Sequence, residues 1–193
     1  MKFEDWFRTR LHVQRYPMPT EISKATGALH VVNVSDMYIH SCAQAARDSE
    51  SAVFYHWFPM NECTGHIGLN SLYGALQILH MAEKEGHRVL LHCAAGANRS
   101  PTVAQAYYFM RTGRHWRDHE EPNSERQATN EWLSLPKTMR SQNRLLGNIE
   151  EGLLPAKAPL EKFLKLCGTK FEEMEQWDRS GLLTQLKLDT GLL

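Results

Sequence analysis

The stretch His92-Cys93-Ala94-Ala95-Gly96-Ala97-Asn98-Arg99-Ser100 separates the short apolar run Val89–Leu91 from Pro101–Met110, a segment typical of the first turns of a helix. The pattern therefore predicts a cysteine in a loop between a strand and a helix, with a glycine inside the loop and an arginine at its end. Backbone N–H groups and a helix N-terminus that point at one spot form a site for anions. A thiolate and a phosphate group are both anions that such a site would stabilise.

These residues resemble the signature loop H-C-x5-R-[ST] of the cysteine-dependent protein tyrosine phosphatases, and the continuation Ser100–Ala104 is most similar to the dual-specificity branch. The resemblance is closest from about His30 to Gly113. It is thin in the N-terminal arm and absent beyond about Gly152. It implies a central, mostly parallel sheet flanked by helices, with the signature loop at the carboxyl ends of the strands. It implies no metal and no organic cofactor.

Cys93 is the predicted nucleophile of this loop. Helix N-termini and nearby cations lower the pKa of a cysteine, so the loop amides and Arg99 would favour the thiolate. The thiolate would attack phosphorus and form a phosphocysteine, which water then hydrolyses. Arg99 would hold two phosphoryl oxygens with a planar fork that lysine lacks. The alternatives are a buried structural cysteine and a surface arginine at the start of a helix.

The other loop residues have supporting roles. Gly96 would permit a backbone conformation closed to residues with a Cβ atom. The resemblance implies that Ser100 stabilises the departing thiolate, although Ser100 could also be a simple helix N-cap. It implies that His92 orients the loop and helps to lower the pKa of Cys93, although His92 could also be a core histidine. The predicted phosphate-binding residues are Ala94, Ala95, Gly96, Ala97, Asn98 and Arg99.

A general acid must protonate the leaving group of a phosphate ester. Dual-specificity phosphatases carry an aspartate for this purpose in a loop before the nucleophile, in a pattern such as I-P-x-x-D. The corresponding run here is Phe58–Glu62, which places Glu62 at the position of that aspartate with a side chain one methylene longer. Glu62 could also be a solvated loop carboxylate. Asp36 and His66 are the second and third candidates for the acid.

Segments with the apolar pattern of strands alternate with segments that have the pattern of helices. This alternation predicts an α/β fold with a parallel sheet at its centre. Residues 1–15 are predicted to form an amphipathic helix or arm. Strands are predicted at 29–34, 52–58 and 88–92. Helices are predicted at 41–51, 69–85, 100–111, 131–151 (interrupted at Pro136) and along an apolar stripe from 160 to 177.

The chain has 193 residues, a length typical of one domain with an appendage. Residues 1–152 are predicted to form the catalytic domain with its N-terminal arm. Residues 153–193 are predicted to be a helical extension packed on the same domain, beyond a hinge that contains Pro155 and Pro159.

The 22 basic residues equal the 22 acidic residues in number, so the formal net charge is zero. This balance argues against attraction to nucleic acid or to an anionic membrane. No apolar run approaches the length of a membrane span, and the first residues lack the apolar centre of a signal peptide. The four cysteines are scattered, which argues against a zinc site or a disulfide framework and favours a reducing cytoplasm.

The predicted activity is hydrolysis of phosphate monoesters in a phosphorylated protein or peptide, with phosphotyrosine, phosphoserine and phosphothreonine all open. Phosphoinositide-selective relatives tend to carry basic residues in the signature loop, so the small Ala94, Ala95 and Ala97 disfavour a lipid headgroup. One alternative is an RNA 5′-triphosphatase of the same superfamily, which the neutral charge disfavours. Another is a phosphate-recognising adaptor with little turnover, which the intact Cys93 and Arg99 disfavour. The oligomeric state stays open.

Overall fold

The computed structural model describes residues 1–61, 67–115, 143–173 and 181–192. Four strands form one sheet in the order β1-β4-β2-β3, and every neighbouring pair is parallel. The fold is therefore α/β with a parallel sheet at its centre, as the sequence predicts. The strands are β1 (Leu11–Gln14), β2 (Leu29–Asn33), β3 (Val53–Trp57) and β4 (Arg88–His92).

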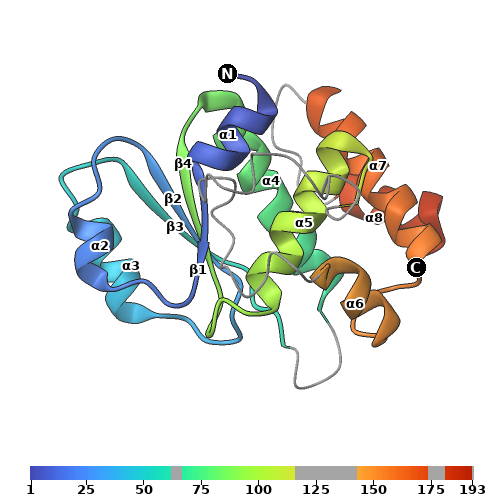
Figure 1. Cartoon of the computed structure of the whole chain (residues 1–193), viewed down its shortest axis with the longest axis horizontal. Helices are drawn as coiled ribbons and strands as arrows, with labels where there is room; N and C mark the ends of the chain where they lie inside the picture. The colour runs from blue at the N-terminus through green and yellow to red at the C-terminus, as the bar shows by residue number, and fades with distance from the viewer. Residues whose placement is uncertain (62–66, 116–142, 174–180, 193) are drawn as a thin grey trace, which may run out of the picture.

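Helices cover both faces of the sheet (Figure 1). One face carries α2 (Pro19–Ser23) and α3 (His40–Arg47), which close a small apolar cluster over β2. The other helices are α1 (Phe3–Thr9), α4 (Leu69–Glu85), α5 (Arg99–Thr112), α6 (Arg144–Glu150), α7 (Lys157–Glu173) and α8 (Gly181–Thr190). The larger apolar cluster lies on the other face of the sheet and includes buried side chains of α1, α4, α5 and α7.

The prediction of a helix or arm across residues 1–15 was wrong in its second half. α1 ends at Thr9, and β1 follows at once, paired with β4. Leu11 and Val13 are buried while His12 is exposed, which is the alternation of a strand. Four residues are too few for this alternation to stand out in the sequence, and the hydrogen bonds of β1 come from a strand far along the chain.

Several other elements agree closely with the prediction. α4 and β4 have the predicted bounds, and α5 begins one residue earlier than expected, at Arg99. Gly86 and Gly113 end α4 and α5 with φ values of 67° and 69°, the left-handed conformation that glycine adopts readily. Of the predicted helix at 131–151, the structure contains α6, and residues 131–142 lie outside the described residues.

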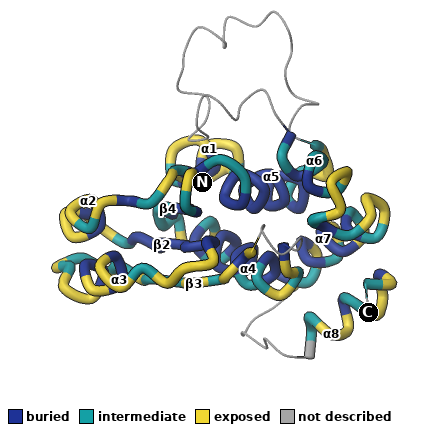
Figure 2. Tube along the Cα trace, turned by 90° about the horizontal axis from the view of Figure 1, so that it is seen from below, coloured by how far each residue is buried: buried dark blue, intermediate teal, exposed yellow. Residues whose placement is uncertain are grey.

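β2 is buried at all five positions because helices cover both faces of a central parallel strand. Figure 2 shows the same burial along nearly the whole of α5, which lies between the sheet and the C-terminal helices. α7 approaches α5 closely at Gly168, where an added Cβ atom would lie 2.9 Å from the carbonyl oxygen of Met110. The apolar stripe predicted at 160–177 supplies this contact up to Phe171, while Met174 and Trp177 lie outside the described residues.

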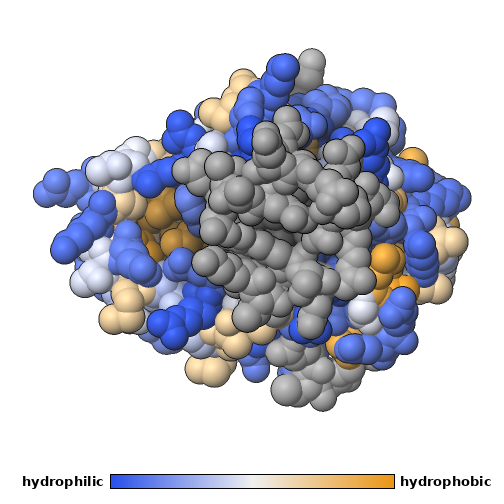
Figure 3. Space-filling view, viewed as in Figure 1, coloured by the Kyte–Doolittle hydropathy of each residue, from blue (hydrophilic) through white to orange (hydrophobic). Residues whose placement is uncertain are grey.

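The surface of the described residues is mostly hydrophilic on the face seen in Figure 1, with hydrophobic groups in small separate areas (Figure 3). Among the described helices, none combines the length and the apolar character that a membrane crossing requires.

Candidate active site

The predicted loop lies where β4 ends and α5 begins, at the carboxyl edge of the sheet. Cys93 follows β4 directly and is only 2% exposed. Its sulfur accepts a hydrogen bond of 3.3 Å from the hydroxyl of Ser100, in the first turn of α5. The structure therefore brings the proposed nucleophile and the hydroxyl that would stabilise it into direct contact.

Opposing effects set the pKa of Cys93. Burial raises it, but the Ser100 hydroxyl and the backbone N–H groups of Ser100, Asn98 and Gly96 all lower it, and the net result is a pKa below the ordinary thiol value. Burial raises the pKa of the thiols of Cys42 and Cys167. Of these three thiols, Cys93 is thus the one whose surroundings favour the reactive thiolate.

Replacing Ser100 with alanine is expected to raise the pKa of Cys93, because a donor to the thiolate is lost. As the pH falls, Cys93 then loses its thiolate form at a higher pH than in the wild type. Alkylation of Cys93 by iodoacetamide at pH 6 should therefore slow several-fold, and the pH profile of alkylation should move to higher pH. Mass spectrometry locates the alkylated residue. Ser23→Ala, which changes an exposed serine of α2, is the matched control. An unchanged profile in Ser100→Ala would remove Ser100 from the stabilisation of the thiolate.

Gly96 is required by a close contact between the loop and the first strand. Its φ is +69°, and an added Cβ atom would lie 2.6 Å from the backbone nitrogen of Arg15 and 2.7 Å from the carbonyl carbon of Gln14. The backbone N–H of Tyr16 also donates to the carbonyl of Ala94 at 3.3 Å. The end of β1 and the residues after it therefore support the loop, a role that the sequence analysis did not assign to this segment.

Asn98 is held by a residue that the sequence analysis missed. The side-chain amide of Asn148, in α6, donates to Oδ1 of Asn98 at 2.9 Å and to the hydroxyl of Thr102 at 2.6 Å. Asn148 is 2% exposed. A polar residue between the apolar Leu145 and Ile149 is the one signal in the sequence that could have indicated a buried polar contact.

Arg99 is 6% exposed, and its Nη1 donates to the carbonyl of Met60 at 3.0 Å and to Oδ1 of Asp36 at 2.9 Å. The hydrogen bond from Arg99 is the largest of the effects that lower the pKa of Asp36. In this arrangement Asp36 is a carboxylate at neutral pH, so it accepts from Arg99 and has no proton to give. Its position beside the guanidinium argues against Asp36 as the general acid.

His92 is fully buried at the end of β4, with the ring of Tyr16 edge-on at a centroid distance of 5.7 Å. Burial lowers the pKa of His92 to about 4, against a smaller opposing effect of the backbone of Cys93. The imidazole is therefore neutral at neutral pH. Any effect of His92 on the Cys93 thiolate must come from the placement of the loop and not from a positive charge.

Glu62 and His66, the first and third candidates for the general acid, lie outside the described residues. On either side, Met60 and Ile67 are buried, and the backbone N–H of Ile67 donates to the carbonyl of Leu153 at 2.8 Å.

Among the described residues, the side chains of His30, Glu85 and His87 are grouped closely enough to hold a metal ion. His30 lies near the start of β2, and Glu85 and His87 lie just before β4. They are thus at the edge of the sheet opposite Cys93.

Comparison with known proteins gives one family match and several distant similarities. The model of the family described as "Dual specificity phosphatase, catalytic domain" matches residues 13–130, more than half of the chain. Dual specificity protein phosphatase 5 of Rattus norvegicus is 27% identical over 78 residues, which are 38% of this chain and 20% of that protein. This chain thus matches about a fifth of the length of that curated relative.

Among solved structures, Tk-PTP in its active form is 21% identical over 74% of this chain and 90% of its own, with a TM-score of 0.44. DUSP15 is 19% identical over 78% of this chain and 80% of its own, with a TM-score of 0.46. The matched family segment contains both Cys93 and Arg99.

Proposed function

The chain belongs to the family of dual-specificity phosphatase catalytic domains, and on this premise we propose that it hydrolyses phosphate monoesters of proteins through a phosphocysteine intermediate. The proposed substrates are phosphotyrosine and, in addition, phosphoserine or phosphothreonine. The observation that carries the proposal is the environment of the Cys93 sulfur, where the Ser100 hydroxyl and several loop N–H groups favour the thiolate. Such an environment activates a cysteine as a nucleophile.

In the first step, the Cys93 thiolate attacks phosphorus, so a sulfur–phosphorus bond forms while the bond from phosphorus to the leaving oxygen breaks. The leaving oxygen takes a proton from the general acid. The guanidinium of Arg99 and the loop N–H groups stabilise the negative charge on the phosphoryl oxygens. In the second step, a water oxygen attacks phosphorus, inorganic phosphate forms, and the sulfur departs as a thiolate that the hydroxyl of Ser100 stabilises.

Glu62 is the general acid of this proposal. Met60, two residues before it in the sequence, accepts a hydrogen bond from Arg99 through its carbonyl oxygen. Asp36, the alternative acid, is already ion-paired with Arg99. The sequence position of Glu62, three residues after Pro59, therefore supports this choice.

Replacing Glu62 with glutamine is expected to slow the release of poor leaving groups far more than that of good ones. p-Nitrophenolate departs without taking up a proton, whereas an alkyl alcohol must receive a proton as it leaves. We expect kcat to fall about 10²-fold or more for a phosphothreonine peptide and much less for p-nitrophenyl phosphate, as is typical of the loss of an acid. Asp36→Asn is the matched carboxylate-to-amide variant, and it should affect both substrates equally. Equal losses in Glu62→Gln would make Glu62 a bystander.

The proposed partners are phosphorylated proteins or peptides, with no nucleic acid and no membrane. The net charge of zero and the uncharged Ala94, Ala95 and Ala97 support this choice over polyanionic RNA and inositol lipids. We further propose that residues 1–152 form the catalytic domain and that residues 153–193 form a helical extension packed on it. A reducing cytoplasm is the proposed location, because a low-pKa thiol is prone to oxidation.

The test is release of inorganic phosphate from a phosphotyrosine peptide, a phosphothreonine peptide, p-nitrophenyl phosphate and RNA with a 5′-triphosphate. Release from the phosphopeptides supports the proposal, and the ratio of the two rates measures the specificity. Release from RNA alone would replace the proposal with an RNA 5′-triphosphatase. If the folded protein binds tungstate but releases phosphate from none of these, the site is a recognition module.

A further inference from the structure

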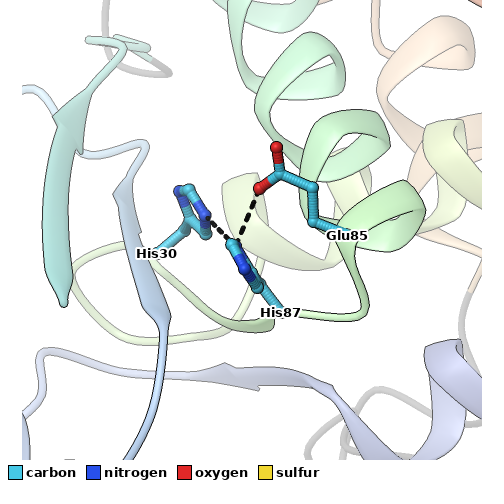
Figure 4. Close-up of side chains that lie close together, drawn as sticks. All are labelled: His30, Glu85 and His87. Atoms are coloured by element: carbon cyan, nitrogen blue, oxygen red, sulfur yellow. Dashed lines mark hydrogen bonds and ion pairs between the residues drawn. The ribbon is translucent and has the colours of Figure 1, made fainter. Parts of the chain in front are cut away.

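A second group of chemically active side chains lies outside the catalytic loop. It consists of His30 in β2, Glu85 at the end of α4 and His87 between α4 and β4 (Figure 4). The Nε2 atom of His30 lies 3.1 Å from Nδ1 of His87, which in turn lies 2.9 Å from Oε2 of Glu85. All three ligand atoms lie within 4.8 Å of one another. The fold therefore brings together an imidazole of β2 with a carboxylate and a second imidazole from the end of α4 and the connection after it.

This cluster is separated from the proposed catalytic residues by the length of a strand. His87 comes just before β4 and Cys93 just after it, while His30 lies at the second position of the parallel strand β2, opposite Val89. The amino ends of parallel strands lie at one edge of the sheet and the carboxyl ends at the other. The cluster therefore takes no part in the proposed reaction at Cys93.

The hydrogen bonds within the cluster compete for a proton. The Glu85 carboxylate only accepts, so Nδ1 of His87 must carry a proton to bond with it. If Nδ1 of His87 donates this proton to Glu85, it has no lone pair to accept a hydrogen bond from Nε2 of His30. If Nε2 of His30 instead donates to Nδ1 of His87, then Nδ1 carries no proton, and its lone pair is occupied while the Glu85 carboxylate receives no hydrogen bond from it. The three atoms thus have a single proton between them, whereas a divalent cation that replaces this proton would accept a lone pair from each of them.

The donor set and the spacing suit such a cation. Zn²⁺ binds imidazole nitrogen and carboxylate oxygen at about 2.0–2.2 Å with tetrahedral geometry, which separates neighbouring ligand atoms by about 3.3–3.5 Å. The separations of 3.1 and 2.9 Å need to grow by a few tenths of an ångström, and Nε2 of His30 and the Glu85 oxygen, which lie within 4.8 Å of each other, need to reach the same spacing. The ring centroids of His30 and His87 lie 5.4 Å apart with an interplanar angle of 21°, and the ion would lie beside the line between the two nitrogens.

The surroundings hold these ligands and leave one side open. His30 is buried, and its Nδ1 lies 3.1 Å from Nε2 of His56, a contact that orients the ring as outer partners of metal ligands do. The carbonyl of His87 accepts a hydrogen bond of 2.8 Å from the indole of Trp6. The side chains of His87 and Glu85 are 29% and 50% exposed, so an ion can enter from solvent and keep a water as its fourth ligand.

We propose that His30, Glu85 and His87 form a binding site for a divalent transition-metal ion of the Zn²⁺ type. The ion is bound by Nε2 of His30, Nδ1 of His87 and a carboxylate oxygen of Glu85. It connects the end of α4 to the amino edge of the sheet, so its binding stabilises the folded chain. Mg²⁺, which prefers oxygen ligands, does not bind there.

The test uses the full chain after treatment with EDTA, in a Cys93→Ser background that removes the Cys93 thiolate as a competing ligand. Titration with Zn²⁺ in competition with a chromophoric chelator should show one equivalent bound, and Zn²⁺ but not Mg²⁺ should raise the melting temperature. Co²⁺ in place of Zn²⁺ should give the visible absorption of a four-coordinate site. Absence of stoichiometric binding by the folded protein would overturn the proposal.

Two variants locate the site. Glu85→Gln and His87→Gln change partly exposed side chains and should fold, and each should weaken Zn²⁺ binding at least tenfold and abolish the rise in melting temperature. His40→Gln, which changes an exposed histidine at the start of α3, is the matched control and should bind like the parent. Equal affinity in Glu85→Gln, His87→Gln and His40→Gln would place the bound ion elsewhere and refute the assignment.

Discussion

Replacing Cys93 with serine is expected to abolish phosphate release while the binding of phosphate analogues persists. A serine hydroxyl at this position stays protonated at neutral pH, so the nucleophile of the first step is lost. Loss of a catalytic nucleophile lowers kcat by a factor on the order of 10⁴–10⁶. The N–H groups of Gly96, Asn98 and Ser100 remain, and so does the guanidinium of Arg99. These are the groups that bind the oxyanion in the proposed mechanism.

Two measurements separate this result from a folding defect. Hydrolysis of p-nitrophenyl phosphate gives the loss of turnover, and calorimetric titration with tungstate gives the affinity for an oxyanion. Cys42→Ser is the matched control, because Cys42 is also buried but belongs to α3, and burial raises the pKa of its thiol. Turnover in Cys93→Ser comparable to that of the wild type would refute the phosphocysteine mechanism.

Replacing Arg99 with lysine is expected to lower kcat/KM about 10²–10³-fold, the usual cost of removing a donor to a charged transition state. The guanidinium is nearly buried, and contacts with Met60 and Asp36 fix its position. Lysine keeps the positive charge but presents a single ammonium in place of a planar fork, so it cannot hold two phosphoryl oxygens at once. The affinity for tungstate should fall together with kcat/KM.

The other end of α5 offers the matched control. Arg111 is ion-paired with Glu83 of α4 and Glu172 of α7, at 2.9 and 2.6 Å, far along the helix from the loop. Arg111→Lys should leave kcat/KM and tungstate affinity near the wild-type values, while the melting temperature falls modestly. If Arg99→Lys behaves like Arg111→Lys, then Arg99 supports the fold and does not bind the substrate.

Short-range patterns predicted a large part of this molecule. The run from His92 to Ser100 indicated a loop between a strand and a helix, and the structure places it between β4 and α5. The spacing of apolar residues and the glycine at position 86 predicted both ends of α4. Each of these features depends on residues within a few positions of one another, because helix periodicity and the left-handed cap are local properties of the backbone.

The residues that surround the loop could not be predicted from short-range sequence patterns. β1 exists because β4 supplies its hydrogen bonds, and its four residues carry too little pattern to oppose a helix prediction. The placement of Asn148 against Asn98 and of Asp36 against Arg99 joins residues far apart in the chain. Nothing local in the sequence marks such pairs.

The sequence by itself thus determined the fold class and the presence of Cys93, Arg99 and Ser100 at one junction between a strand and a helix, because that junction is a single continuous segment. Only the tertiary structure decided which side chains surround it and that His30, Glu85 and His87 meet at the opposite edge of the sheet. The physical reason is the parallel sheet. It brings strands that are distant in the sequence into register, and side chains from separate segments come into contact only when that register is formed.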